Sequence, residues 1–206
     1  MDNNYLQTIL TMITFKDIIN ILIIAVIVIF QNEIRFFFRR VGAHVGHHWV
    51  WGKKRLQQAE LNRIVEQLNE AILNMSKSYT GALIVIAGQQ DLSEYTDTGK
   101  EVDAKVSAPL IENIFFKNTP LHDGALLIMD GRIQSAACIL PVSGNKDLPL
   151  DYGLRHRAAL GLTEKTDATA IVVSEETGRI TIAQRSALRT IEPEQLKAVL
   201  SLLIFG

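Results

Sequence analysis

Apolar and polar residues alternate with two different periods along the chain after residue 55. From about Arg55 to Lys77 the apolar positions recur at helical spacing, which predicts an amphipathic helix. The run ALIVIA at residues 82–87 predicts a buried strand, and the alternating VDAKV at 102–106 predicts a half-buried one. Ser107 then caps a helix that ends at residue 115 or 116.

The second half of this region predicts two hairpins, one turning at Asp130-Gly131 and one at Thr177-Gly178. Strands and helices are interspersed, which indicates the α/β class with a mixed, mainly antiparallel central sheet covered by helices. The expected strands are residues 125–129, 132–140, 168–173 and 179–184, and the expected helices are 154–160 and 192–203.

The N-terminal part carries a strongly apolar run, IINILIIAVIVIF, from Ile18 to Phe30. A membrane-spanning helix needs about 20 residues, and apolar flanks can lengthen this run. A spanning helix is favoured over a helix that lies on the membrane or packs on the domain. Arginines after the run predict a cytoplasmic C-terminal part at the cell membrane. We expect a membrane segment at 1–42, a basic and aromatic linker at 43–55, and one domain at 56–206.

The linker contains three histidines at helical spacing, His44, His47 and His48, which could suit a metal. Neighbouring glycines weaken a helix there, and no carboxylate or cysteine lies nearby, so metal binding is disfavoured. Trp49 and Trp51 are typical of the interface between membrane and water.

Composition excludes several classes of protein. The 206 residues carry a net charge of −1, so no general surface for nucleic acid is expected. Cys138 is the sole cysteine, which excludes a disulfide within the chain, and its apolar surroundings predict a buried structural thiol.

Three polar clusters stand out at the ends of the predicted core strands. In the first, Asp123 precedes Gly124 at the start of a strand. A carboxylate there can bind a hard cation or accept a proton, and glycine lets a ligand approach the backbone. The alternative is an aspartate that only caps its own turn.

The second cluster is Arg155-His156-Arg157 at the start of a short helix. Arginine forks bind phosphate oxygens bidentately, and a helix N-terminus adds partial positive charge. The alternative is a solvated basic turn.

The third cluster, Ser174-Glu175-Glu176, follows a buried strand, and by itself it is more typical of a solvated turn. Together the clusters supply carboxylates for a metal and arginines for phosphates, which fits phosphoryl or nucleotidyl transfer. No GxxxxGK[ST] loop is present, nor is GxGxxG after a strand.

The stretches TPLHDGALLI, CILPVS, GLRHRAALGLTEKTDA and VVSEETGRI resemble the diadenylate cyclase domain over roughly residues 56–184. Its signatures are the DGA and RHR motifs, followed here by SEE. The N-terminal stretch resembles the last transmembrane helix of the membrane-bound housekeeping branch, which usually has three. The resemblance implies the fold of that domain.

The resemblance also implies a reaction in which two ATP become cyclic di-AMP and two pyrophosphates. Two subunits, in a homodimer or a higher homo-oligomer, would meet face to face, and each 3′-hydroxyl would attack the α-phosphate of the opposite ATP. Mg²⁺, Mn²⁺ or Co²⁺ would be the cofactor. By family analogy, a regulator protein and phosphoglucosamine mutase are partners.

The resemblance also implies a role for each residue of this chain that matches a position in the family's motifs. Asp123 would bind the metal and help deprotonate the 3′-hydroxyl. Gly124 and Ala125 would let the nucleotide lie against backbone. Arg155 and Arg157 would neutralise the triphosphate, while His156 would orient phosphate or sit near the metal. His122 is interpreted as a structural histidine. The remaining implied positions are Leu83 and Leu140 at the adenine, Leu154 where the family usually has a ligand-contacting threonine, Ser174 and Glu175 at the nucleotide, and Glu176 at the metal.

Two other classes of protein compete with the enzyme. One is a membrane module that senses a nucleotide without turning it over, and the other is a membrane scaffold that recruits partners. The intact DGA, RHR and SEE set argues against the sensor, because a pure sensor need not keep a metal carboxylate, and loss of turnover in Asp123→Asn with the fold kept would separate the enzyme from both.

Overall fold

The computed structural model describes residues 16–26, 58–145, 148–149 and 152–205. The chain divides into two compact units, Met1–Arg55 and Leu56–Gly206. In the first unit the described part is a helix of residues 16–26 with exposed apolar side chains. No helix within these described ranges combines the length and the apolarity needed to cross a bilayer. The rest of the predicted membrane segment, with the histidines and tryptophans at 44–51, lies outside the described residues.

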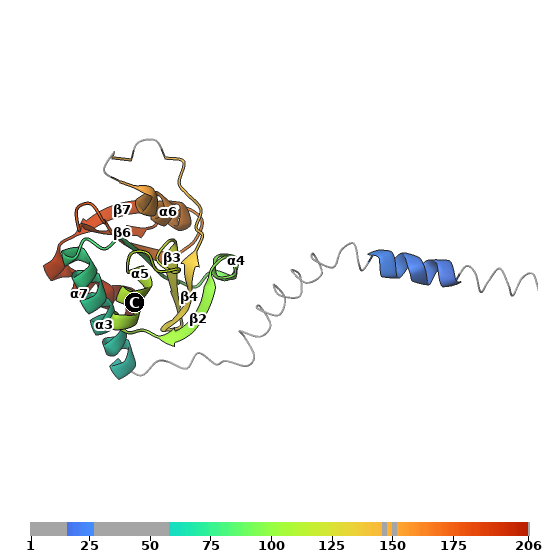
Figure 1. The fold of residues 1–206 in the computed structure, drawn as a ribbon, viewed down its shortest axis with the longest axis horizontal. Coiled ribbons are helices and arrows are strands. Elements are labelled where there is room, and N and C mark those ends of the chain that lie inside the picture. Colours follow the sequence, from blue (N-terminus) through green and yellow to red (C-terminus); the bar gives the residue numbers. More distant parts are fainter. Residues whose placement is uncertain (1–15, 27–57, 146–147, 150–151, 206) are drawn as a thin grey trace, which may run out of the picture. The chain divides into compact units, whose positions relative to one another are not determined.

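The second unit is built on one seven-stranded sheet (Figure 1). The order across the sheet is β2-β4-β3-β1-β5-β6-β7, in which only β1 and β3 are paired in parallel. The predicted mixed, mainly antiparallel sheet is therefore confirmed. The strands are β1 (Ala82–Ile86), β2 (Lys100–Lys105), β3 (Ala125–Met129), β4 (Arg132–Cys138), β5 (Thr169–Val173), β6 (Ile180–Gln184) and β7 (Ala187–Ile191).

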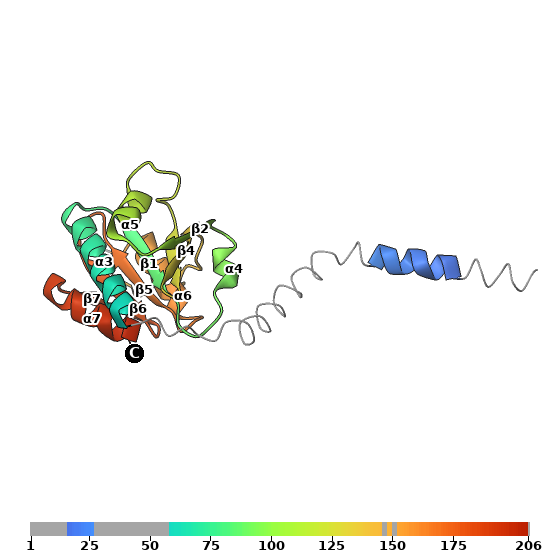
Figure 2. The same cartoon turned by 90° about the horizontal axis from the view of Figure 1, so that it is seen from below.

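Helices cover both faces of this sheet. Three helices pack together on one face, and α6 packs on the other against β1, β5, β6 and β7 (Figures 1 and 2). The short α4 contacts β4. The first three are α3 (Gln58–Lys77), α5 (Ala108–Phe115) and α7 (Pro193–Phe205), and the other two are α4 (Ser93–Thr96) and α6 (Leu154–Thr163).

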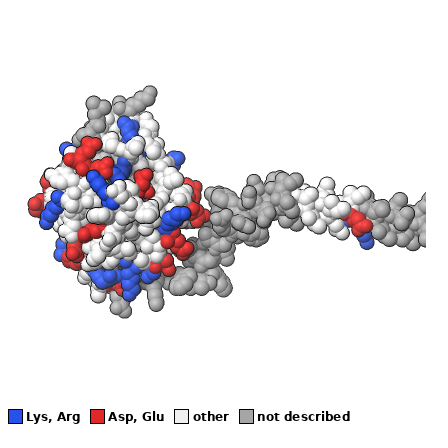
Figure 3. Space-filling model, in the orientation of Figure 1, with Lys and Arg blue, Asp and Glu red and all other residues white. Residues whose placement is uncertain are grey.

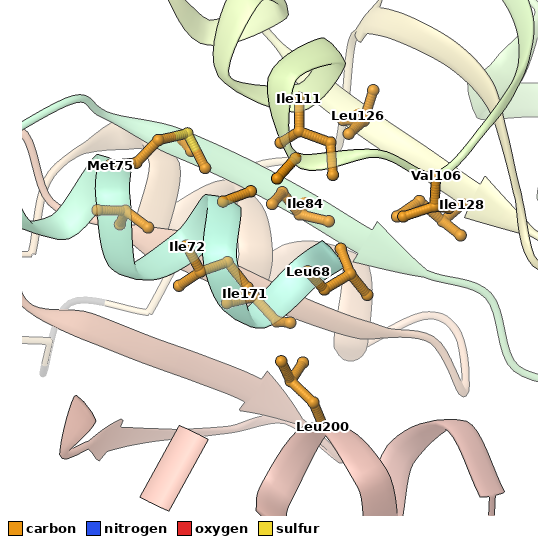
Figure 4. Close-up of a cluster of buried hydrophobic side chains, with 14 of the residues drawn as sticks. Leu68, Ile72, Met75, Ile84, Val106, Ile111, Leu126, Ile128, Ile171 and Leu200 are labelled. Atoms are coloured by element: carbon orange, nitrogen blue, oxygen red, sulfur yellow. The ribbon is translucent and has the colours of Figure 1, made fainter. Parts of the chain in front are cut away.

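Alternation along the central strands creates two hydrophobic cores. In β1, Ile84 points toward α3, whereas Leu83 and Val85 belong to the core beneath α6. Figure 4 shows Leu68 and Ile72 of α3 facing Ile84 across the first core, with other α3, α5 and α7 side chains around them. Because both faces are buried, β1 reads as a continuous apolar run in the sequence.

The predicted elements match the structure closely, with two omissions. The hairpin strand β7 was not predicted, because most of its residues are exposed and its sequence ALRTI gives no apolar alternation. The single turn α4 lies in a stretch predicted to be polar and turn-like. Ser107 is the N-cap residue of α5, as expected, but makes no side-chain capping bond; instead the Ala108 amide donates to Gln67 Oε1 at 2.9 Å.

Acidic and basic side chains are interspersed over the face shown in Figure 3. This distribution agrees with the small net charge of −1. Cys138 is buried, as predicted, and this burial raises the pKa of its thiol to about 11.

Candidate functional site

The strand register brings two of the three polar clusters, Asp123 with Gly124 and Ser174-Glu175-Glu176, to one edge of the sheet. β1 and β3 run in parallel and begin there, and β4 and β5, antiparallel to them, end there. The site edge, as we call it, comprises the residues just before Ala82 and Ala125 and just after Cys138 and Val173. Since β3, β1 and β5 are neighbours about 4.8 Å apart, the backbones of Asp123 and of the turn after β5 lie about 10 Å from each other.

Asp123 lies exposed at the mouth of β3. Its carboxylate makes no hydrogen bond or ion pair with any residue that the structure describes. Gly124 beside it has a φ of +114°, and a Cβ there would lie 2.7 Å from the carbonyl carbon of Ala137. This close approach arises because β4 bulges opposite β3, where Ala137 itself has a φ of 55°. Glycine is therefore required, and the acid is presented to solvent.

Arg155 projects from the first turn of α6 toward the turn after β5. Its Nη1 lies 3.1 Å from Oε2 of Glu175, and the Arg155 side chain is 25% exposed. Both groups lie close to Gly81, the residue that precedes β1. A Cβ on Gly81 would lie 2.6 Å from Nη1 of Arg155 and 2.9 Å from Oε2 of Glu175. Two of the three clusters are thus in direct contact.

Arg157 is held by a different segment. Its Nη1 donates to the carbonyl of Asn145 at 3.1 Å, and its own carbonyl accepts from the Ser143 amide at 3.0 Å. The segment that contains Pro141 and Ser143 packs closely against Gly161 on the next turn of α6. A Cβ on Gly161 would lie 2.3 Å from the Pro141 carbonyl oxygen, so glycine is needed for this contact. The CILPVS stretch and the RHR motif therefore form one packed unit.

His156 faces inward from α6 and is 4% exposed. Its ring stacks on that of Tyr152, with centroids 4.6 Å apart and planes 9° apart. The two arginines are half-buried on either side of it. This places His156 in the packing beneath the site rather than on its open surface.

Ser174 organises the turn that carries the two glutamates. Its Oγ accepts from the amides of Glu176 and Thr177, each at 3.3 Å, and its carbonyl accepts from Gly178 at 2.9 Å. The hydroxyl proton is still available to a ligand oxygen. Glu176 is exposed, and its side chain has no hydrogen bond or ion pair within the described part of the chain.

The three leucines predicted at the nucleotide lie in different environments. Leu83 and Leu140 are buried together in the core beneath α6. Leu154, the first residue of that helix, is 78% exposed. The structure therefore brings Leu83 and Leu140 together and leaves Leu154 on the outer surface of the RHR motif.

Sequence reasoning missed Gly81 and Tyr152 as parts of the site. Nothing marks Gly81 except its position before a buried strand, and Tyr152 lies before the start of α6, outside the RHR motif. His122 has the tethered ring expected of a structural histidine, with Nδ1 2.6 Å from the Thr119 carbonyl oxygen. That contact leaves Nε2 as the nitrogen open to a ligand.

The donor set at the site edge fits a hard divalent cation. Asp123 and Glu176 both present exposed carboxylates without protein partners among the described residues, and such oxygens are preferred by Mg²⁺ and Mn²⁺. No group of three potential ligand side chains is preformed within the described residues. Mg²⁺ typically binds to one or two carboxylates together with substrate phosphates, so two carboxylates suit a site that the substrate completes.

Residues 69–188 match the family model DAC, described as DisA bacterial checkpoint controller nucleotide-binding. The chain is 39% identical to "Cyclic di-AMP synthase CdaA" of Bacillus subtilis over 86% of its own length and 64% of that protein. It is 35% identical to "Diadenylate cyclase" of Mycoplasma genitalium over 76% of its own length and 78% of that protein. The chain thus spans a little under two thirds of the Bacillus relative's length.

Solved structures agree with these matches. The crystal structure of DacA from Staphylococcus aureus, a double mutant, superposes with a TM-score of 0.68 at 37% identity, covering 70% of this chain and 97% of that one. A structure described as a hypothetical membrane spanning protein from Bacillus cereus gives 0.60 at 32% identity, covering 91% and 93% of the two chains.

Proposed function

This chain belongs to the DAC family, and from that premise we propose that it is a diadenylate cyclase. It condenses two ATP into cyclic di-AMP and releases two pyrophosphates. The observation that carries the proposal is that an exposed acid and an acidic turn lie at one sheet edge, with Arg155 in direct contact with that turn. A fold that only had to be stable would not need three charged motifs there.

Asp123 accepts the proton of the 3′-hydroxyl, for which an exposed carboxylate at the open edge is well placed. The 3′-oxygen then forms a bond to the α-phosphorus of the ATP in the opposing subunit, and the bond from that phosphorus to the bridging oxygen breaks. The electron pair leaves with pyrophosphate. Gly124 and Ala125 let the nucleotide approach the backbone where Gly124 lacks a Cβ.

Arg155 and Arg157 bind the triphosphate through charge-assisted hydrogen bonds to its oxygens. The N-terminus of α6 adds partial positive charge beside them. His156 supports both arginines by fixing the first turn of α6 on Tyr152. Ser174 donates its remaining hydroxyl proton to a phosphate oxygen, and Leu83 and Leu140 border the adenine, with Leu154 at the rim of the same site.

Diadenylate cyclases generally need a divalent metal, and Asp123 with Glu176 would hold Mg²⁺, Mn²⁺ or Co²⁺ here. When bound, the cation offsets negative charge on the triphosphate. The two carboxylates would also fix its position relative to the arginines.

Because one subunit holds one ATP, the enzyme acts as a homodimer or a higher homo-oligomer. Residues 56–206 form the catalytic domain, in agreement with the compact unit that begins at Leu56. Residues 1–42 form a membrane segment and residues 43–55 a linker, with the catalytic domain on the cytoplasmic side of the cell membrane. Support comes from the apolar run and from the Bacillus cereus structure described as membrane spanning. The regulator protein and phosphoglucosamine mutase are partners by family analogy.

The test is product formation by the purified full chain. The wild type and Asp123→Asn are incubated with ATP and each of Mg²⁺, Mn²⁺ and Co²⁺, and the products are identified by mass spectrometry. We expect cyclic di-AMP from the wild type, no product with a chelator, and a loss of about a thousandfold in Asp123→Asn, the size typical of a lost general base. The melting temperature should not change, because the Asp123 side chain has no described partner.

A folded, dimeric wild type that binds ATP but makes no product with any of the three metals would contradict the enzyme. That outcome would favour the nucleotide-sensing module. Failure to bind ATP as well would favour the scaffold.

A further inference from the structure

The contact between Arg155 and Glu175 over Gly81 carries an inference beyond the functions assigned to the motifs. We infer that Glu175 and Gly81 are positioning residues, which act on the nucleotide only by holding the Arg155 guanidinium. This inference rests on the proposed function, since it concerns the phosphate-binding role of Arg155. It changes the expectation that Glu175 itself binds the nucleotide.

Glu175 is suited to orient an arginine and poorly suited to bind a triphosphate directly. Its carboxylate is negative, and Oε2 is already 3.1 Å from Nη1 of Arg155. A guanidinium has five N–H donors, so this contact leaves others to bind phosphate oxygens. An arginine held before binding loses less side-chain freedom when the ligand arrives, and affinity rises accordingly.

Gly81 supplies the space in which the pair lies. The three nearest atoms to an added Cβ all belong to the pair: Nη1 of Arg155 at 2.6 Å, Oε2 of Glu175 at 2.9 Å and Cζ of Arg155 at 3.0 Å. No backbone atom is among them. The backbone of Gly81 is not in the left-handed region that favours glycine. Alanine at this position would therefore displace the two flexible side-chain ends and leave the strand in place.

The turn that carries Glu175 has its own support at the end of α3. Ser76 Oγ donates to the Gly178 carbonyl at 2.5 Å, and a Cβ on Gly178 would lie 2.5 Å from the Ser76 carbonyl oxygen. Gly178 has a φ of +68°, a conformation that glycine adopts without strain. Glu175 thus projects from a turn fixed both by Ser174 and by α3, which makes it a stable partner for Arg155.

The experiment is a double-mutant cycle on the full chain. Glu175→Gln and Gly81→Ala are made in the wild type and in Arg155→Ala, with Gly144→Ala as a matched control because no atom outside its two chain neighbours lies within 4 Å of a Cβ there. Binding of a non-hydrolysable ATP analogue, kcat, KM and melting temperature are measured. Each variant should raise Kd and KM about fivefold to tenfold with kcat within about twofold, as expected for binding lost equally from ground and transition states.

In the Arg155→Ala background neither change should weaken binding further, because the residue through which both act is gone. Additive losses there would overturn the inference and indicate that Glu175 contacts the nucleotide or metal itself. A fall in kcat with KM unchanged would also overturn it, since a merely structural defect reduces the active fraction. The Kd values of the ATP analogue test the inference even if no cyclic di-AMP forms. A wild type that binds no analogue overturns both this inference and the proposed function.

Discussion

The two ends of β1 resemble each other in structure, but the carboxylates that lie there bind different groups. At each end a glycine lies against a carboxylate: Gly81 against Glu175, and Gly88 against Asp167. At the Gly88 end, both carboxylate oxygens are used by the protein, since Oδ2 accepts from the Gln89 amide at 2.8 Å and Oδ1 from the Gln90 amide at 3.1 Å. That carboxylate closes a loop and has little left to offer a ligand.

At the Gly81 end the carboxylate is paired with a cation instead of with backbone amides. Arg155 keeps donors that the ion pair does not use, and Asp123, just before the neighbouring strand β3, has no partner among the described residues. The difference shows that a carboxylate at a strand end is informative only through its partners. Satisfied backbone amides indicate stability, whereas an arginine or open solvent indicates chemistry.

The largest effect that tests this comparison, after the loss expected for Asp123→Asn, comes from Arg157→Ala in the first turn of α6. A charge-assisted hydrogen bond is worth about 1.5–3 kcal/mol, so kcat/KM should fall roughly tenfold to a hundredfold. Steady-state kinetics of cyclic di-AMP formation measure it. Stability should change little, because among the described residues the Arg157 side chain makes a single hydrogen bond, to the Asn145 carbonyl. Unchanged kcat/KM would remove Arg157 from the site.

The opposite result is expected at the other end of the strand. Asp167→Ala removes the acceptor of two backbone amides, and because the site is exposed the cost should be about 1–2 kcal/mol of unfolding free energy. Chemical denaturation measures this change. At a temperature where the variant is folded, kcat and KM should equal those of the wild type. A selective rise in KM would show that the two ends of β1 are coupled. It would contradict the interpretation that Asp167 serves stability alone.

The last prediction concerns Cys138, which pairs with Ala125 at the site edge but belongs to the packing beneath it. Burial raises the pKa of this thiol from 9.0 to about 11. Folding therefore favours the neutral thiol, and its contribution to stability is complete below about pH 9 and is lost as pH rises toward about 11. Unfolding free energies measured across this range should fall more steeply for the wild type than for Cys138→Ala. Equal slopes would contradict the assignment of Cys138 to the core.

Much of the fold could be predicted because its signals are local. The buried strand at residues 82–87 and the hairpin at Asp130-Gly131 follow from apolar runs and turn residues. β7 could not be predicted, because its place in the sheet depends on pairing with β6 and not on a pattern of its own. Likewise, the bulge that forces a glycine at position 124 exists only where β3 meets β4.

The sequence by itself determined the class of fold, the buried thiol and the three charged motifs, because periodicity, composition and short motifs are properties of consecutive residues. Only the tertiary structure decided which of these groups meet. Arg155 and Glu175 are separated by 20 positions and Gly81 lies far from both along the chain, yet they come together where α6 crosses the ends of β1 and β5. Such contacts arise from strand register and helix packing, which depend on the whole core rather than on any one segment.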